Sequence, residues 1–328
     1  MTENCSVNCS EGKNMTQDTK LCKDFTLFEV ESVPLSIIIL NSGLNTILVI
    51  VSILANSLVV SAVWRTPSLR YPSIVFLCGL AVSDLAIGLV VQPWFVAVEL
   101  LKIHGLPSGG DCTLETAFLA LGFLVCGVSF GLVTLISVDR YIAIQYPLRY
   151  PSIVTLPRVL FLITLCWLAS TFCSSLILWH FSAFLYVVAT VMMVFLGTST
   201  VIHVIIYRIV RRHRNEIRAQ EQAVQTTNEF NMARFKKTAV NTFIVYYFLL
   251  LCYVPFSIAW VLRMTGATSL DNPIVWKVAN TIVFLNSAVN PFLYCWRLPA
   301  IRAPVMTLLK KIFCRWTITG VWKLQMIT

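Results

Sequence analysis

The sequence predicts an all-α membrane protein: a bundle of seven transmembrane helices with the N-terminus outside and the C-terminus inside. Of the 328 residues, 57% are hydrophobic and only 12% are charged, a composition too apolar for a soluble domain. The chain also contains uncharged stretches of about 20 residues, the length that a helix needs to cross a bilayer. Positive charge gathers in the connections on one side of these stretches.

Five apolar stretches each predict one spanning helix: 35–64, 74–98, 116–138, 238–262 and 278–296. A sixth stretch, residues 159–207, contains no Asp, Glu, Lys or Arg and is too long for one helix, so we expect two helices with a turn near His180. The predicted organisation is an extracellular segment 1–34, a seven-helix domain 35–297 and a cytoplasmic tail 298–328.

The charge distribution predicts the orientation. The predicted cytoplasmic segments hold 19 of the 25 Lys and Arg, and such an excess marks the cytoplasmic side. Three glycosylation motifs agree with an extracellular N-terminus, at Asn4, Asn8 and Asn14. We interpret the net charge of +10 as cytoplasmic loops that face anionic membrane lipids and an acidic protein partner, not nucleic acid.

Two motifs stand where spans are expected to reach the cytoplasm. Asp139-Arg140-Tyr141 follows the uncharged run 116–138, and Asn290-Pro291-Phe292-Leu293-Tyr294 lies late in the last span. With these motifs the chain resembles the rhodopsin-like family of G-protein-coupled receptors. The resemblance implies a plasma-membrane receptor, not an enzyme, that binds an extracellular ligand and promotes nucleotide exchange on a heterotrimeric G protein. Arrestin is a further partner that it implies.

The resemblance also implies a switch. Arg140 would pair with Asp139 at rest and contact the Gα subunit once released, with Leu148 as an apolar knob on that partner. Pro255 would be the pivot of the sixth helix, although Tyr253 stands where the family usually has Trp. The full set for coupling and switching is Asp139, Arg140, Tyr141, Pro147, Leu148, Tyr207, Tyr253, Pro255, Asn290, Pro291 and Tyr294.

An acidic residue, Asp84, lies in the middle of the second span, where an ionisable group is costly. Asp84 therefore needs polar partners, and two kinds of site would supply them. One is a plain hydrogen-bond network between helices. The other comes from the resemblance, which matches four more residues to the family's allosteric sodium pocket: Ser129, Asn286, Ser287 and Asn290. All of them offer oxygen ligands suited to a hard cation.

Two residues that bind known ligand classes in the family are missing from this sequence. Gly122 stands where amine receptors carry an Asp, and Phe284 where opsins carry the retinal Lys. Three acids are expected at the outer rim, Glu99, Asp111 and Glu115, either as a solvated face or as a site for a cationic peptide or Ca²⁺. The short second outer loop resembles the melanocortin–cannabinoid–adenosine branch. A wide mouth suits a peptide or a lipid.

Three further expectations concern cysteines and the tail. The family's usual extracellular disulfide lacks its partner, so we expect Cys112 to pair with an N-terminal cysteine such as Cys22. Pro299 and Pro304 predict a broken helix in the tail, with an apolar patch at the membrane interface. Cys314 beside this patch is a palmitoylation candidate.

Other functions stay open. One is a constitutively active or orphan receptor without a diffusible agonist, since the basic segment Arg234-Phe235-Lys236 offers no acid to hold Arg140 at rest. A more distant one is a membrane transporter, although the chain shows no internal repeat of the kind that many transporters contain.

Overall fold

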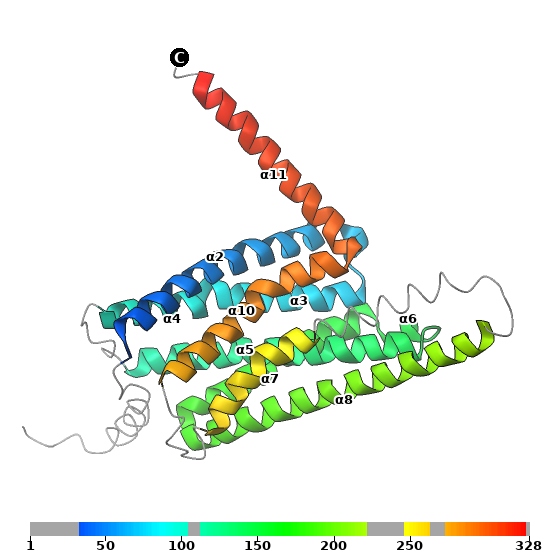
Figure 1. The fold of residues 1–328 in the computed structure, drawn as a ribbon, viewed down its shortest axis with the longest axis horizontal. Helices are drawn as coiled ribbons and strands as arrows, with labels where there is room; N and C mark the ends of the chain where they lie inside the picture. The colour runs from blue at the N-terminus through cyan, green and yellow to red at the C-terminus, as the bar shows by residue number, and fades with distance from the viewer. Residues whose placement is uncertain (1–32, 104–111, 222–245, 263–272, 326–328) are drawn as a thin grey trace, which may run out of the picture.

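The structure is a computed structural model that describes residues 33–103, 112–221, 246–262 and 273–325. Every regular element in these residues is a helix (Figure 1). The helices are α2 (Leu35–Arg65), α3 (Pro72–Ala86), α4 (Gln92–Ile103), α5 (Cys112–Gln145), α6 (Tyr150–Ile153), α7 (Leu156–Trp179), α8 (Phe181–Glu221), α10 (Pro273–Arg297) and α11 (Pro299–Gln325), with the short turns η1 (Pro67–Leu69) and η2 (Ile87–Val91). A further helix, Tyr246–Leu262, precedes α10 and is drawn in yellow.

Five of these helices are long and apolar enough to cross a membrane: α2, the continuous α3–η2–α4 unit, α5, α7 and α8. The shorter apolar helix Tyr246–Leu262 and the 25-residue α10 complete the bundle. The all-helical prediction is therefore confirmed, and only His180 separates α7 from α8, at the predicted turn. The orientation of the termini stays a prediction.

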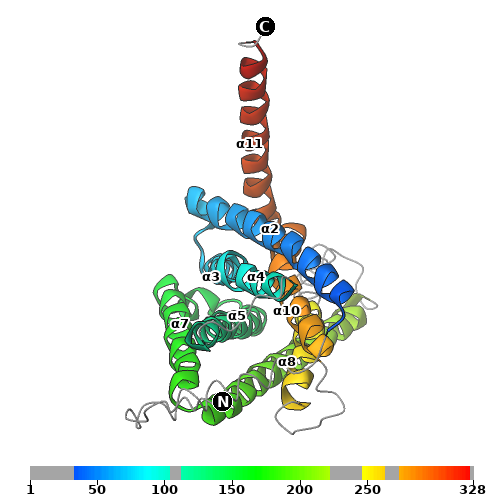
Figure 2. The same cartoon turned by 90° about the vertical axis from the view of Figure 1, so that its left-hand side faces the viewer.

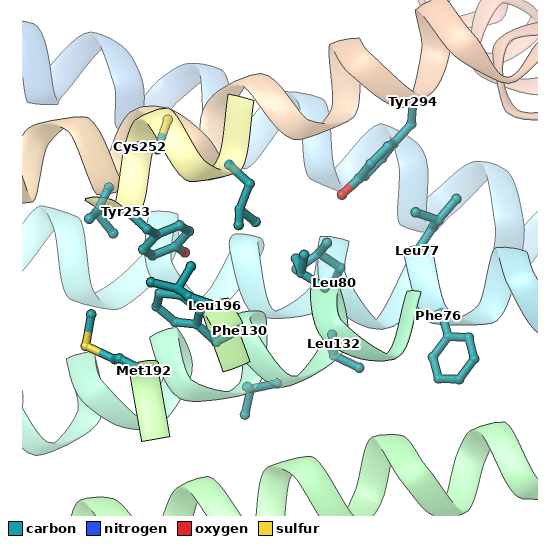
Figure 3. Close-up of a cluster of buried hydrophobic side chains, with 14 of the residues drawn as sticks. Phe76, Leu77, Leu80, Phe130, Leu132, Met192, Leu196, Cys252, Tyr253 and Tyr294 are labelled. Atoms are coloured by element: carbon teal, nitrogen blue, oxygen red, sulfur yellow. The ribbon is translucent and has the colours of Figure 1, made fainter. Parts of the chain in front are cut away.

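Helix α5 lies at the centre of the bundle and packs against α3, α7 and α8, whereas α2 packs against α3, α4 and α10 (Figures 1 and 2). The core between them is apolar, and in Figure 3 Phe130 and Leu132 of α5 lie near Leu196 of α8 and Leu80 of α3. Large apolar side chains such as Phe172 and Trp179 of α7 remain exposed on the outside. An apolar exterior is what a bundle surrounded by lipid requires.

The second span is not one regular helix. Five residues, Ile87–Val91, form a π-turn in which the N–H of Gln92 bonds to the carbonyl of Ile87. A π-turn contains one more residue than an α-turn, so it rotates everything that follows around the helix axis. It thereby sets the direction in which Gln92 and Glu99 point. Hydropathy does not reveal such a turn, and the sequence analysis missed it.

The tail differs from the prediction. Pro299 and Pro304 do not break it: α11 runs from Pro299 to Gln325 and projects away from the bundle (Figure 2). Pro299 stands at the first helical position, where no N–H bond is needed. Pro304 removes a single backbone bond, and the burial of Ile301 and Val305 in the core compensates for it.

We predict that Gly131→Leu destabilises the bundle. A Cβ atom at Gly131 of α5 would lie 3.0 Å from Cys166 Sγ of α7 and 3.9 Å from Phe195 of α8, so a larger side chain must push these helices apart. Overpacking of this kind costs about 1–3 kcal/mol, measurable as a lower melting temperature of the purified protein. Gly197→Leu is the matched control, because no atom lies within 4 Å of a Cβ there. Equal melting temperatures for the two variants would contradict the prediction.

Candidate functional site

The Asp139 carboxylate, at the end of α5 that adjoins the start of α3, is held by three side chains. Oδ2 accepts a hydrogen bond from Arg140 Nη2 at 2.6 Å and another from Ser73 Oγ at 2.9 Å. Oδ1 accepts from the hydroxyl of Tyr150 at 2.6 Å. The Asp139 side chain is buried, whereas Arg140 remains partly accessible. Neither Ser73 nor Tyr150 was identified from the sequence, because nothing in its pattern brings α3 and α6 to this carboxylate.

Tyr150 is a reliable donor to this carboxylate. Its burial, together with its hydrogen bond to Asp139, raises the pKa of the Tyr150 hydroxyl to about 12. Because the pKa is raised, the phenol keeps its proton at every physiological pH and continues to donate. The three contacts therefore persist together, and they fix Arg140 beside Asp139.

The other predicted switch residues have different surroundings. Leu148 lies beyond α5 with 96% of its surface exposed, so it is accessible to a partner. Tyr253 packs against Phe130 of α5 with ring centroids 4.0 Å apart and the ring planes tilted by 51°, in the core region shown in Figure 3. Tyr294 of α10 is buried and points into the bundle in the same view, whereas Tyr207 of α8 is half-exposed. Pro255 and Pro291 lie inside helices that continue through them.

Asp84 is fully buried at the junction of α3, α2 and α10. Its Oδ2 accepts a hydrogen bond from Asn290 Nδ2 at 2.9 Å, which joins two of the predicted residues directly. Asn56 of α2 donates to the carbonyl of Ser287 at 3.0 Å and so ties α2 to α10. Ser129 of α5, the fourth residue predicted beside Asp84, bonds to Ser83 Oγ of α3 at 3.0 Å.

The chemistry of this cluster fits a small cation. Asp84 Oδ1, Asn286 Oδ1 and Ser287 Oγ are buried, and none of them makes a hydrogen bond of good geometry within the described residues. The Ser287 hydroxyl nevertheless interacts with the Asp84 carboxylate, and Asn286 interacts with the Tyr253 hydroxyl. A carboxylate with amide and hydroxyl oxygens nearby is the ligand type that hard cations prefer. The same contacts also fit a hydrogen-bond network, so the geometry is compatible with both interpretations.

The opposite end of the bundle contains an ion pair that the sequence analysis missed. Lys277 Nζ of α10 bonds to Glu99 Oε1 of α4, and both side chains are buried. The interpretation of Glu99 as part of a solvated face is therefore wrong, since its charge is buried and paired, whereas the interpretation as part of a site for a cation stays a prediction. Lys277 was overlooked because the predicted span began just after it. Of the other rim acids, Asp111 lies outside the described residues, and so does the side chain of Glu115.

A polar seam continues from this ion pair into the bundle between α2, α4 and α10. Gln92 Nε2 donates to Asn45 Oδ1 at 3.1 Å, and Asn45 Nδ2 donates to Thr281 Oγ1 at 2.8 Å. Thr281 Oγ1 in turn lies 2.8 Å from Asn41 Oδ1. All four side chains are buried. The seam joins α2, α4 and α10 by side-chain hydrogen bonds.

Aromatic rings on the same helices pack against one another. Trp94 of α4 stacks on Phe118 of α5 with centroids 3.9 Å apart, and Phe95 meets Phe284 of α10 edge to face at 5.5 Å. A second group spans α5, α8, the helix Tyr246–Leu262 and α10. Its members are Phe123, Phe184, Phe256, Trp260 and Trp276. The end of the bundle opposite Arg140 thus combines an ion pair with extensive aromatic surface.

Several predictions fall where the structure gives no description. The glycosylation motifs at Asn4, Asn8 and Asn14 lie outside the described residues, as does Cys22. Cys112 and Cys314 lie in helices, but their side chains are not described, so the disulfide and the palmitoylation stay predictions.

A comparison with protein families tests the resemblance directly. The chain matches the model of the 7 transmembrane receptor (rhodopsin family) over residues 55–183 and 177–294. These two stretches include Asp84, the Asp139-Arg140-Tyr141 motif and the segment from Asn290 to Tyr294. They cover well over half of the chain, and the chain therefore belongs to the rhodopsin family of seven-transmembrane receptors.

Proposed function

We propose that this protein is a plasma-membrane receptor that binds an extracellular ligand and then catalyses nucleotide exchange on a heterotrimeric G protein. The observation that carries the proposal is the Asp139 carboxylate, which Ser73 and Tyr150 hold by hydrogen bonds and which pairs with the Arg140 charge. A group of short hydrogen bonds at a helix end defines one of two states, in which Arg140 is held. Family membership supplies the expected partner for the other state.

The proposed mechanism is a shift between these two states. A ligand at the end of the bundle opposite Arg140 favours a state in which the part of helix Tyr246–Leu262 before Pro255 moves away from the bundle axis. In that state Arg140 leaves Asp139 and contacts the Gα subunit. A ligand can shift this equilibrium only by its difference in affinity for the two states. The exposed Leu148 adds an apolar contact for the same partner. Arrestin would use the same face of the open state.

The test of the proposed function is Arg140→Ala. We expect exchange of GDP for GTPγS on a panel of purified Gα subunits to rise in the presence of the reconstituted wild type. The variant should lose most of this activity, because the partner loses its charged contact, while its melting temperature stays close to that of the wild type. Arg302→Ala, at an exposed arginine of α11, is the control. Absence of stimulation on every Gα tested would overturn the proposal.

We predict that Tyr150→Phe raises basal exchange. The variant removes one of three hydrogen bonds to Asp139 and leaves the ring in place. A bond to a charged group contributes about 1.5–3 kcal/mol, and about 1.4 kcal/mol is a factor of ten in the equilibrium between the two states, so basal exchange should rise by about tenfold or more. Arg140→Ala in the same background should abolish the increase. An unchanged basal rate would show that Tyr150 does not hold the resting state.

We further propose that Na⁺ binds at Asp84 and stabilises the resting state, with oxygens from Ser129, Asn286 and Ser287 as the candidate ligands. The buried Asp84 carboxylate, with the Ser287 hydroxyl beside it and a further buried amide at Asn286, supports this. The wild type should melt at a higher temperature in NaCl than in choline chloride at equal ionic strength. Asp84→Asn should remove that difference, since it removes the charge while keeping the shape of the side chain. A sodium-dependent shift that persists in Asp84→Asn would exclude the ion from this site.

A further inference from the structure

We propose that Glu99 is the anchoring carboxylate for a small organic cation with an aromatic body, and that Lys277 is an internal counter-ion which this ligand displaces. The inference rests on the proposed receptor function and names the chemical class of its ligand. Glu99 belongs to α4 and Lys277 to α10, at the end of the bundle opposite Arg140.

The first argument is that one oxygen of the Glu99 carboxylate lacks a hydrogen-bond donor. Glu99 Oε1 is paired with Lys277 Nζ, but Glu99 Oε2 is buried and has no hydrogen-bond partner within the described part of the chain. A buried carboxylate oxygen without a donor is costly, and the cost is larger for a charged group than for a neutral one. A donor carried by a ligand would meet this requirement.

The second argument concerns which partner can leave. The Glu99 side chain is 4% exposed and the Lys277 side chain 10% exposed, and Lys277 carries its charge on a longer, flexible stem. A ligand cation at Glu99 lets the Lys277 ammonium move toward water, so the number of buried charges is unchanged. An anion at Lys277 would instead leave Glu99 buried and unpaired, which is strongly destabilising. The site therefore favours cations over anions.

The third argument is the aromatic surface beside the pair. Phe95 lies one turn before Glu99 on α4 and meets Phe284 edge to face, and Trp94 stacks on Phe118. Trp276 is next to Lys277 and packs on Trp260 with ring centroids 5.8 Å apart. Aromatic faces attract organic cations and pack well against an aromatic body.

Displacement of Lys277 would also have a mechanical effect. The ion pair is a direct link between α4 and α10, next to the hydrogen-bonded seam of Asn45, Gln92 and Thr281. A cation that replaces Lys277 breaks this link while satisfying Glu99. The two helices can then change their relative position without exposing an unpaired charge.

The test uses three indole probes with one aromatic body and different head groups: tryptamine as the cation, indole-3-propionate as the anion and 3-methylindole as the neutral control. Binding to the purified protein in nanodiscs is measured as a shift in melting temperature against probe concentration. Tryptamine should stabilise the wild type, and the other two probes should not. Glu99→Gln should abolish the tryptamine response.

Variants of Lys277 test the inference even if tryptamine binds the wild type too weakly to shift its melting temperature. Lys277→Met should bind tryptamine at least about tenfold more tightly than the wild type, because the resident competitor is gone. Lys277→Arg should retain wild-type affinity. If Lys277→Met alone is too unstable to purify, the double variant Glu99→Gln/Lys277→Met should recover stability and show no tryptamine response.

Three results would overturn the inference: a tryptamine response that survives in Glu99→Gln, a response to indole-3-propionate that depends on Lys277, or no tryptamine response in either the wild type or Lys277→Met. Exchange on Gα is measured with the same preparations. Arg140-dependent exchange without Glu99-dependent binding refutes this inference alone, whereas Glu99-dependent binding without exchange on any Gα refutes the receptor function alone.

Discussion

Pairing of polar groups inside an apolar environment is the constraint on which this structure depends. Hydrocarbon offers no hydrogen bonds, so the polar side chains of the spanning helices must satisfy one another. Asn290 of α10 donates to Asp84 of α3, and Asn56 of α2 donates to the Ser287 carbonyl of α10, and these bonds help to fix how the three helices meet. The apolar core around α5 contributes packing, but many arrangements of apolar side chains would fill that space, and few would pair these polar groups.

Helix α10 connects two polar regions of the molecule, the Glu99–Lys277 ion pair with its seam and the Asp84 cluster. It carries Lys277 near its start, Thr281 one turn later and Asn290 at the Asp84 cluster. Both regions therefore contact the same continuous element, although Pro291 removes one of its backbone bonds. A packed helix with contacts at both ends is a physical route by which one region can influence another, provided that the helix has two discrete positions.

The sequence predicted the spans well because charge-free apolar length is a direct requirement of the bilayer. It also predicted the Asp84–Asn290 contact and the Asp139–Arg140 pair, since both are fixed by motifs. The remaining parts depend on geometry that no local pattern encodes. The π-turn at Ile87–Val91 decides where Glu99 points, and Tyr150 reaches Asp139 only through the path of the chain between α5 and α7.

The predictions were wrong where contacts with distant parts of the chain outweighed a local sequence rule. Two prolines predicted a broken tail, but the first occupies a position that suits proline, and the burial of Ile301 and Val305 supports the helix beyond the second. Glu99 was assigned to a solvated rim because its partner stands 178 positions away in the chain. Sequence reasoning sees acids one at a time, whereas the electrostatic environment of each belongs to the assembled bundle.

The single residue between α7 and α8 has a kinetic consequence. His180 alone makes this connection, so this segment is too short to fold over the end of the bundle as a lid. A slow escape of a bound molecule would therefore have to arise from its contacts with the helices or from another segment. The α7–α8 connection itself therefore adds no barrier to the exchange of a bound molecule with the surrounding medium.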